Sequence, residues 1–374
     1  MTDYAAQVDH LARLTSEGRR RTLAPRVGID FASNDYLGLA QSSSLREAAE
    51  GALARGVPLG AGGSRLLRGN HAEHEALEAE AAAQFGAERA LYFANGFIAN
   101  LALFSTLPQR EDLVLYDELI HASVHEGLNR SRAQTVKTAH NDVGSVADNI
   151  AIYRLHGGTG RVWIAVESLY SMDGDVAPLE ELAALADAHD ATLVIDEAHA
   201  TGVYGGQGAG LAEALEGRDN IITLHTFGKA LGCEGALVCG PGALIDFLIN
   251  RARGFIFTTA PSPVMAAVGR AALRLVAGNL EHQFRLAALV AHAGQAFQAR
   301  LGLARSGTHI QPIILGDNAR TMAAAAACQA EGYDVRGIRP PTVPQGTSRL
   351  RISLTLNATA ADVDGLVGVL ERAL

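Results

Sequence analysis

Short apolar runs alternate with helix-like segments through the middle of the chain. Val162–Val166 and Leu193–Ile195 are continuously apolar, as strands buried on both faces of a parallel sheet are, and residues 221–224 repeat the pattern. Between the first two runs, Pro178–Leu185 places leucines at helical spacing. A further apolar run covers Ala236–Cys239. The alternation predicts β-α-β units, and therefore a mostly parallel sheet with helices on both faces.

A helix is predicted upstream of this region, beginning close to Asn70. Glu73 lies three residues after Asn70, which resembles the capping box that satisfies free N–H groups at a helix start. Leu77, Ala81 and Phe85 then share one helical face. We expect this face to be buried.

The end of the chain has a different pattern. Residues 308–315 and 349–355 are strand-like, and the second segment alternates with a period of two, which predicts a half-exposed sheet. We therefore expect an N-terminal segment over residues 1–42, a large domain over 43–275 and a smaller α+β domain over 276–374.

Composition narrows the class of protein. The chain has 374 residues, of which 48% are hydrophobic and 19% charged, and its formal net charge is −9. Arg19–Arg21 is its longest basic run, which argues against a nucleic-acid surface. No apolar run reaches the length of a membrane span. The three cysteines, Cys233, Cys239 and Cys328, show no metal-ligand spacing, and they indicate a reducing, cytoplasmic location.

The first candidate chemistry involves Lys229 and Asp196. Asp196 ends the run at 193–195, and Lys229 follows the run at 221–224, so both are expected at the carboxyl edge of one sheet, where open α/β folds bind ligands. A lysine alone in such a place is more often a solvated charge. An amine that forms a Schiff base, together with a carboxylate for a pyridinium nitrogen, is what pyridoxal phosphate requires of its protein.

Two neighbouring motifs fit the same ligand. Asn95-Gly96-Phe97 stands between an apolar run and a helical pattern, where backbone N–H groups and the helix dipole favour a phosphate, although Asn-Gly is often only a turn. Ser171 lies just past the run at 162–166, in a segment whose Asp173-Gly174 pair is typical of a turn. Its hydroxyl group is therefore also expected at the carboxyl edge.

Other kinds of site are not supported. Asp196–His199 spells the Asp-Glu-Ala-His sequence of helicases, but the single Gly-Lys pair of the chain is not followed by serine or threonine, so no P-loop is present. The pairs His71 with His74 and His121 with His125 lack an obvious third ligand, so we expect no zinc site. A Gly-x-Ser-x-Gly elbow of serine hydrolases does not occur.

Six segments together resemble the α-oxoamine synthases, a family of fold-type I pyridoxal phosphate enzymes, along nearly the whole chain. They are residues 30–39, 60–65, 121–123, 171–175, 196–202 and 226–229. Segments nearer the end resemble one branch, which condenses L-alanine with a pimeloyl thioester in biotin biosynthesis. They are residues 257–260, 309–312, 316–318, 338–344 and 349–351.

The resemblance implies a fold, an activity and partners. The fold is α/β, with a mostly parallel central sheet in a large domain and a smaller α+β C-terminal domain. The activity is pyridoxal-phosphate-dependent acyl transfer with decarboxylation, in a homodimer whose active sites lie at the subunit interface. Coenzyme A and acyl carrier protein both remain open as the thioester carrier. Glycine C-acetyltransferase and serine or long-chain acyl-CoA enzymes of the family remain alternatives, followed by a lyase or aminotransferase and a non-catalytic binding protein.

The resemblance also implies roles for individual residues. Lys229 would hold the cofactor covalently and remove the Cα proton of the substrate, and Asp196 would face the pyridine nitrogen. At about 4 Å and an effective dielectric constant near 20, such a pair is worth about 4 kcal/mol, enough to keep the nitrogen protonated. The remaining contacts are His121 on the ring, His199 and Ser171 near the ring hydroxyl, Gly96, Phe97 and Thr226 on the phosphate, Thr258 and Thr259 on the phosphate of the neighbouring subunit's cofactor, and Arg351 with Asn34 on the substrate carboxylate.

Overall fold

The computed structural model describes residues 4–23 and 25–374 and divides into two compact units. Unit 1 contains the described residues up to Tyr36, the short stretch Met172–Gly174, and Arg285–Leu374. Unit 2 contains Leu37–Ser171 and Asp175–Phe284. The expected three-part division at residues 42 and 275 stays a prediction.

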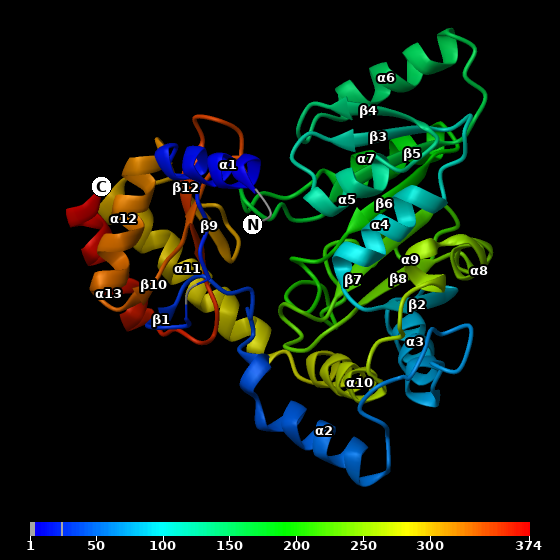
Figure 1. The fold of residues 1–374 in the computed structure, drawn as a ribbon, viewed down its shortest axis with the longest axis horizontal. Helices are drawn as coiled ribbons and strands as arrows, with labels where there is room; N and C mark the ends of the chain where they lie inside the picture. Colours follow the sequence, from blue (N-terminus) through cyan, green and yellow to red (C-terminus); the bar gives the residue numbers. More distant parts are fainter. Residues whose placement is uncertain (1–3, 24) are drawn as a thin grey trace. The chain divides into compact units, whose positions relative to one another are not determined.

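Unit 2 is built around a seven-stranded sheet with the order β2-β8-β7-β6-β5-β3-β4 (Figure 1). Its strands are β2 (Arg89–Phe93), β3 (Leu113–Asp117), β4 (Gln134–Thr138), β5 (Val162–Glu167), β6 (Thr192–Asp196), β7 (Ile221–Thr226) and β8 (Ala236–Gly240). Strand β8 pairs antiparallel with both neighbours, whereas the pairs from β7 to β4 are parallel. Six strands therefore run in one direction, which confirms the mostly parallel sheet, and their carboxyl ends share one edge.

Helices cover both faces of this sheet because its central strands are apolar on both sides. All six residues of β5 and all five of β6 are buried. One face packs against α4 (Gly96–Thr106), α5 (Ala122–Leu128), α8 (Gly242–Arg251) and α9 (Arg253–Ile256). The other packs against α6 (Val143–Leu155), α7 (Leu179–Ala188) and the 3-10 turn Glu213–Leu215. At about 2 kcal/mol for each fully buried aliphatic side chain, these two layers dominate the stability of the unit.

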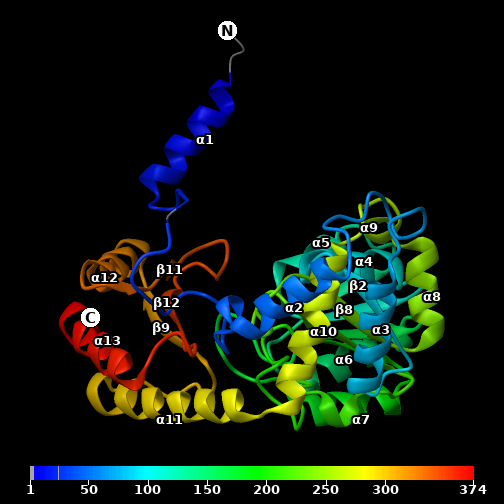
Figure 2. The same ribbon diagram turned by 90° about the horizontal axis from the view of Figure 1, so that it is seen from below.

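The remaining helices of unit 2 form a separate group. Helix α10 (Pro263–Gly278) packs against both α2 (Ser43–Ala54) and α3 (Ala72–Gln84), as Figure 2 shows, and a 3-10 turn at Leu39–Gln41 precedes α2. Leu77, Ala81 and Phe85 are buried, as their spacing predicts.

The predicted cap of α3 was wrong by one residue. The helix is capped by His71, whose Nδ1 accepts the backbone N–H of Glu73 at 3.1 Å, and the Nδ1 of His74 accepts the backbone N–H of His71 at 3.3 Å. Asn70 instead donates to the carboxylate of Glu75. The imidazole nitrogen takes the place of the usual hydroxyl or carboxamide acceptor, which the residue preferences for caps do not anticipate.

Unit 1 contains a three-stranded antiparallel sheet with the order β11-β12-β9. Its strands are β9 (Ile310–Gly316), β11 (Gly337–Ile338) and β12 (Ser348–Ser353), and a two-residue pair joins β1 (Ile29–Asp30) to β10 (Tyr333–Asp334) in parallel. The accompanying helices are α1 (Ala5–Ser16), α11 (Glu281–Leu301), α12 (Asn318–Ala330) and α13 (Ala360–Ala373), of which α11 begins in unit 2.

The expectation of a half-exposed strand was wrong for β12, because all six of its residues are buried. Leu350 and Ile352 belong to an apolar core that includes residues of α12 and α13. On the alternate positions, Arg349 and Arg351 are buried with their guanidinium groups hydrogen-bonded to other polar groups. The alternation of residues along β12 therefore separates an apolar side from a polar side. Both sides are buried, since polar groups tolerate burial when they are hydrogen-bonded.

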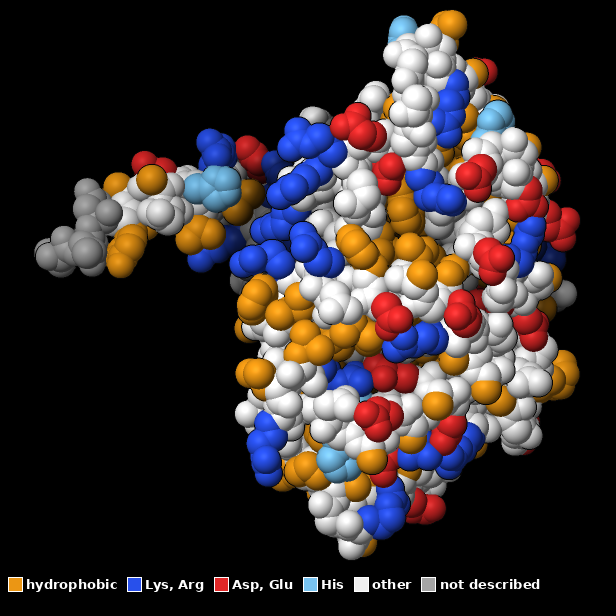
Figure 3. All heavy atoms as spheres, turned by 90° about the vertical axis from the view of Figure 1, so that its right-hand side faces the viewer, with side chains coloured by type: hydrophobic (Ala, Val, Ile, Leu, Met, Phe, Trp, Pro, Cys, Tyr) orange, Lys and Arg blue, Asp and Glu red, His pale blue; other side chains and the backbone are white. Residues whose placement is uncertain are grey.

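Acidic and basic side chains are interspersed on the face drawn in Figure 3, and Lys and Arg side chains gather towards one edge of it. Within residues 4–23 and 25–374, no helix is long and apolar enough to cross a membrane. The same residues contain no group of three or more His, Cys, Asp or Glu side chains suited to hold a metal ion.

Candidate active site

The carboxyl edge of the central sheet gathers the polar residues of unit 2. Asp196 is the last residue of β6, and it pairs in register with Glu167, the last residue of β5. Thr226 ends β7, and Lys229 follows three residues later. Parallel strands of similar length end together, so residues far apart in the chain meet at this edge.

Lys229 lies directly against a histidine. Its Nζ is 2.8 Å from Nε2 of His199, a buried residue in the turn after β6. Lys229 itself is only partly buried. The amine is therefore held in place by a neighbouring nitrogen while part of its side chain remains accessible, as a covalent anchor for a ligand must be.

Asp196 is held by two donors. Its Oδ2 accepts from the carboxamide of Asn100 at 2.7 Å, and its Oδ1 accepts the backbone N–H of Ala198 at 2.9 Å. Asn100 is buried on α4 and also donates to Ser123 Oγ at 3.0 Å. Sequence reasoning missed Asn100, although a single carboxamide in an otherwise apolar helix is a signal that could have identified it.

His121 continues this chain of hydrogen bonds. It caps α5, where its Nδ1 accepts the backbone N–H of Ser123 at 3.2 Å and lies 2.7 Å from Ser123 Oγ. Partial removal from water lowers the pKa of His121, with Asp196 opposing this effect and Lys229 adding to it. Contacts from Asp196 through Asn100 and Ser123 to His121 thus connect the end of β6 to the start of α5.

The start of α4 fits the phosphate of pyridoxal phosphate. A Cβ atom at Gly96 would lie 2.8 Å from the methyl carbon of Thr226, so the approach of these two segments requires glycine. The Thr226 hydroxyl is buried and has no hydrogen-bond partner among the described residues. Phe97 follows at the helix start with 43% of its surface exposed. Helix-start N–H groups beside an unsatisfied hydroxyl match an anion.

Glu167 is a further acidic residue at the edge, to which the sequence analysis gave no role. It is buried, and its Oε2 accepts the backbone N–H of Ser171 at 3.1 Å. Burial and the neighbouring charge of Asp196 raise its pKa well above the ordinary value, against the opposing effect of Lys229. Through this hydrogen bond, Glu167 fixes the backbone that carries Ser171.

The two predicted carboxylate-binding residues lie in unit 1, where a tyrosine connects them. Arg351 donates to Tyr36 Oη at 3.1 Å and to Ser353 Oγ at 2.6 Å, and Tyr36 donates to the Asn34 side chain at 2.9 Å. The His309 ring packs against Tyr36, with 4.0 Å between ring centroids. Tyr36 was part of a recognised segment but was assigned no role. Only the tertiary structure reveals its position between the two predicted residues.

Thr258 and Thr259 lie outside these contacts. Both are exposed on unit 2, just after α9. The adjacent Phe257 exposes 71% of its surface.

Comparisons with known proteins identify the family of the chain. The family model for class I and II aminotransferases matches residues 26–370. The chain is 44% identical to an 8-amino-7-oxononanoate synthase of Anaeromyxobacter dehalogenans (strain 2CP-1 / ATCC BAA-258), over 97% of this chain and 94% of the relative. It is 41% identical to another enzyme of that name from Azoarcus sp. (strain BH72), over 97% and 95% of the two chains.

Solved structures give the same result. A serine palmitoyltransferase from S. paucimobilis with bound PLP superposes with a TM-score of 0.88 at 26% identity, covering 99% of this chain and 97% of the other. An 8-amino-7-oxononanoate synthase from Francisella tularensis superposes with a TM-score of 0.79 at 27% identity, covering 92% and 97%. The chain belongs to the class I and II aminotransferase family and, within it, to the α-oxoamine synthases, the fold-type I pyridoxal phosphate enzymes that include the 8-amino-7-oxononanoate synthases.

Proposed function

We propose that this chain catalyses the decarboxylative condensation of L-alanine with a pimeloyl thioester, which yields 8-amino-7-oxononanoate, carbon dioxide and the free thiol. The observation that carries the proposal is the placement of Lys229 Nζ 2.8 Å from His199, at the sheet edge where Asp196 also ends its strand. Kinship above 40% identity to synthases of this name supports the choice of substrates.

Unit 2 supplies the groups that would hold pyridoxal phosphate. When bound, the cofactor supplies an electrophilic carbonyl carbon and a ring that withdraws electrons from the Cα atom of the substrate. The Thr226 hydroxyl and the N–H groups of Gly96 and Phe97 would bind its phosphate. Asp196 would hold a proton on the pyridine nitrogen, and His121 would pack against the ring. His199 and Ser171 would contact the ring hydroxyl.

Lys229 has two tasks in this proposal. Its amine would hold the cofactor covalently, and the free amine would take the proton from Cα of L-alanine. Both tasks need Nζ in its unprotonated form for part of the cycle. The adjacent His199 nitrogen orients the amine and offers a place for a hydrogen bond.

Arg351 binds the carboxylate of the amino acid, with Asn34 beside it. A planar guanidinium group can donate two parallel hydrogen bonds to a carboxylate, which fixes the orientation of the substrate as well as its charge. Tyr36 and Ser353 hold the guanidinium group from the other side. Arg351 is thus oriented before the substrate binds.

We also propose that the enzyme is a cytoplasmic homodimer. The exposed Phe257, next to Thr258 and Thr259, supports a subunit contact here, because a large aromatic residue gains free energy when it is covered. In this arrangement the two threonines bind the phosphate of the cofactor in the neighbouring subunit. The three cysteines are free, which suits a reducing compartment.

A thiol-release assay tests the reaction. L-alanine, glycine and L-serine are each combined with pimeloyl-CoA, acetyl-CoA and palmitoyl-CoA, and the products are identified by mass spectrometry. We expect kcat/KM to be highest for L-alanine with pimeloyl-CoA. A preference for L-serine with palmitoyl-CoA would replace the proposal with the activity named for the serine palmitoyltransferase structures. Release of no thiol from any acyl-CoA, repeated with pimeloyl carrier protein, would refute acyl transfer altogether.

A further inference from the structure

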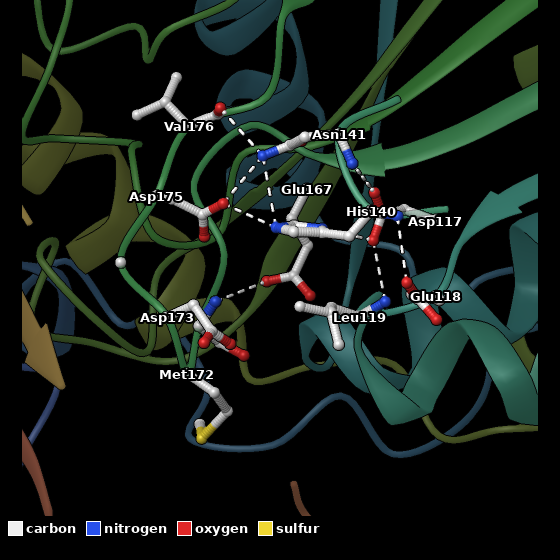
Figure 4. Close-up of polar contacts among 12 residues, drawn as sticks. Asp117, Glu118, Leu119, His140, Asn141, Glu167, Met172, Asp173, Asp175 and Val176 are labelled. Carbon is white, nitrogen blue, oxygen red and sulfur yellow. Dashed lines mark hydrogen bonds and ion pairs between the residues drawn. The ribbon is translucent and has the colours of Figure 1, made fainter. Parts of the chain in front are cut away.

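A cluster of charged residues lies beside the site but takes no part in the proposed chemistry (Figure 4). His140 follows β4 by two residues and stands between two carboxylates. Its Nδ1 is 2.8 Å from Asp117 Oδ1, at the end of β3, and its Nε2 is 2.6 Å from Asp175 Oδ2, in the loop after β5. A carboxylate only accepts hydrogen bonds, so both ring nitrogens must donate. This geometry makes His140 an imidazolium cation.

The groups around His140 favour this cation. Asp117 is 3% exposed and also accepts the backbone N–H groups of Leu119 and Asn141, which fix its orientation. Asn141 donates to Asp175 Oδ2 at 2.8 Å, so that oxygen receives two donors. Burial by itself would lower the pKa of His140, but hydrogen bonds and charges from Asp117 and Asp175 outweigh it and raise the pKa to about 10.

A third polar group reaches the ring of His140: the carboxamide nitrogen of Asn141 lies 3.3 Å from Nε2, farther than the 2.6 Å contact of Nε2 with Asp175. The edge of its ring meets Tyr170, with centroids 4.5 Å apart at an angle of 86°. Its backbone N–H donates to Glu118 at 3.3 Å, and Glu118 in turn pairs with Lys137 at 3.6 Å.

Asp175 connects His140 to the segment that carries Ser171, a residue proposed to contact the cofactor. Its backbone carbonyl accepts the N–H of Tyr170 at 2.9 Å, and Leu169 pairs with Val176 in an antiparallel bridge. Tyr170 immediately precedes Ser171, whose backbone N–H is bound by Glu167. The short hairpin that carries Ser171 is therefore held in its turn by Glu167 and, through Asp175, on its returning strand by His140.

We propose that His140 is a positioning residue, a cationic clamp between Asp117 and Asp175 that ties the ends of β3 and β4 to the hairpin carrying Ser171 and so orders the pyridoxal phosphate site before the cofactor binds. The inference deepens the proposed function and rests on it for the role of Ser171. It can be tested by cofactor binding alone, so its failure is distinguishable from a wrong choice of substrate.

The first test replaces His140 with glutamine. The glutamine side chain has one donor nitrogen where the charged imidazole has two, and it carries no charge. In the cofactor-free protein, hydrogen exchange of the backbone amides of residues 168–177 should become faster. The dissociation constant of pyridoxal phosphate should rise about tenfold. His292→Gln, in the exposed His292–Asp364 pair of unit 1, is the matched control and should change neither quantity. Wild-type exchange and affinity in a folded His140→Gln protein would overturn the proposal.

A second variant keeps the histidine and tests the pH dependence of cofactor affinity, which a purely structural role of His140 would leave unchanged. In Asp175→Asn one of the two charges that hold the proton is lost, so His140 should release it within the range from about pH 6 to 9. Cofactor affinity relative to wild type should then fall as the pH rises across that range, whereas wild-type His140 stays charged. A ratio of affinities that does not change with pH would count against the clamp, even if His140→Gln failed to fold.

Discussion

The two units present their candidate functional residues in different ways. In unit 2, Asp196 and Thr226 are the last residues of parallel strands and Lys229 follows one, so chain direction alone brings them to one edge. In unit 1, Arg351 lies inside an antiparallel strand whose six residues are all buried. Its guanidinium group is oriented by Tyr36, more than 300 positions earlier in the chain. A parallel sheet collects polar groups at an edge, whereas an antiparallel one needs a specific partner for each buried charge.

The strongest test of the proposed site at the carboxyl edge of the unit 2 sheet is Lys229→Ala. We expect kcat to fall by about 10⁴-fold or more, because the anchor and the base are removed together. The chain has only two lysines, so Lys137→Ala is a complete control and should retain activity. Borohydride reduction with pyridoxal phosphate, followed by peptide mapping, should modify Lys229 and leave Lys137 unlabelled. Cofactor attached to Lys137 in the active enzyme would remove the basis of the assignment.

The buried arginine of unit 1 should give a smaller and different effect. Arg351→Gln loses a charge-assisted pair of hydrogen bonds to the substrate carboxylate, so KM for L-alanine should rise about 100-fold. The affinity for pyridoxal phosphate should stay near wild type, since the residues proposed to bind the phosphate are all in unit 2. Arg300→Gln, which removes an exposed pair with Glu371, serves as the control. Unchanged KM for L-alanine would show that unit 1 does not bind the carboxylate through this residue.

A smaller effect is expected from adding a methyl group to the proposed phosphate-binding site at the start of α4. Gly96→Ala places a methyl group 2.8 Å from the Thr226 side chain, and a crowding cost of about 1–3 kcal/mol corresponds to cofactor binding that is about 5- to 150-fold weaker. Gly51→Ala, in a helix where the nearest atom would be 3.7 Å away, should bind normally. The measurement is equilibrium titration of the cofactor-free proteins with pyridoxal phosphate. Equal affinity for pyridoxal phosphate in both variants would mean that the start of α4 does not bind the phosphate group.

The last prediction concerns the stability of unit 2, and it is expected to leave activity near neutral pH unchanged. Burial, with a contribution from Arg65, lowers the pKa of His74 to about 4, and its Nε2 lies 2.9 Å from the Pro261 carbonyl. Because the folded pKa is below the ordinary 6.5, this stabilisation is fully present above pH 6.5. It is lost as the pH falls through 4, with a limit of about 3 kcal/mol. Denaturant unfolding of His74→Gln should show a weaker dependence on pH over this range than wild type, and the exposed His189→Gln should not.

Several parts of the site can be predicted from local sequence patterns. Asp196 and Lys229 stand at strand ends, and the order of apolar runs predicts that these ends coincide. Glu167 and His140 carry no such signal of their role, and the carboxamide of Asn100 does not reveal that Asp196 is its partner. Asn100 and His140 act through partners far away in sequence, and an isolated polar residue in a sequence does not reveal which group it will face.

The sequence by itself determined the parallel layering, the position of Lys229 and Asp196 near the ends of neighbouring strands, and the family, because hydrophobic periodicity and contiguous motifs are local properties of the chain. Only the tertiary structure decided that His71 caps α3, that β12 is buried on both sides, and that His140 bridges Asp117 and Asp175. Those outcomes depend on which polar groups meet after the chain has folded. The free energy of a buried hydrogen bond or ion pair is set by both partners together.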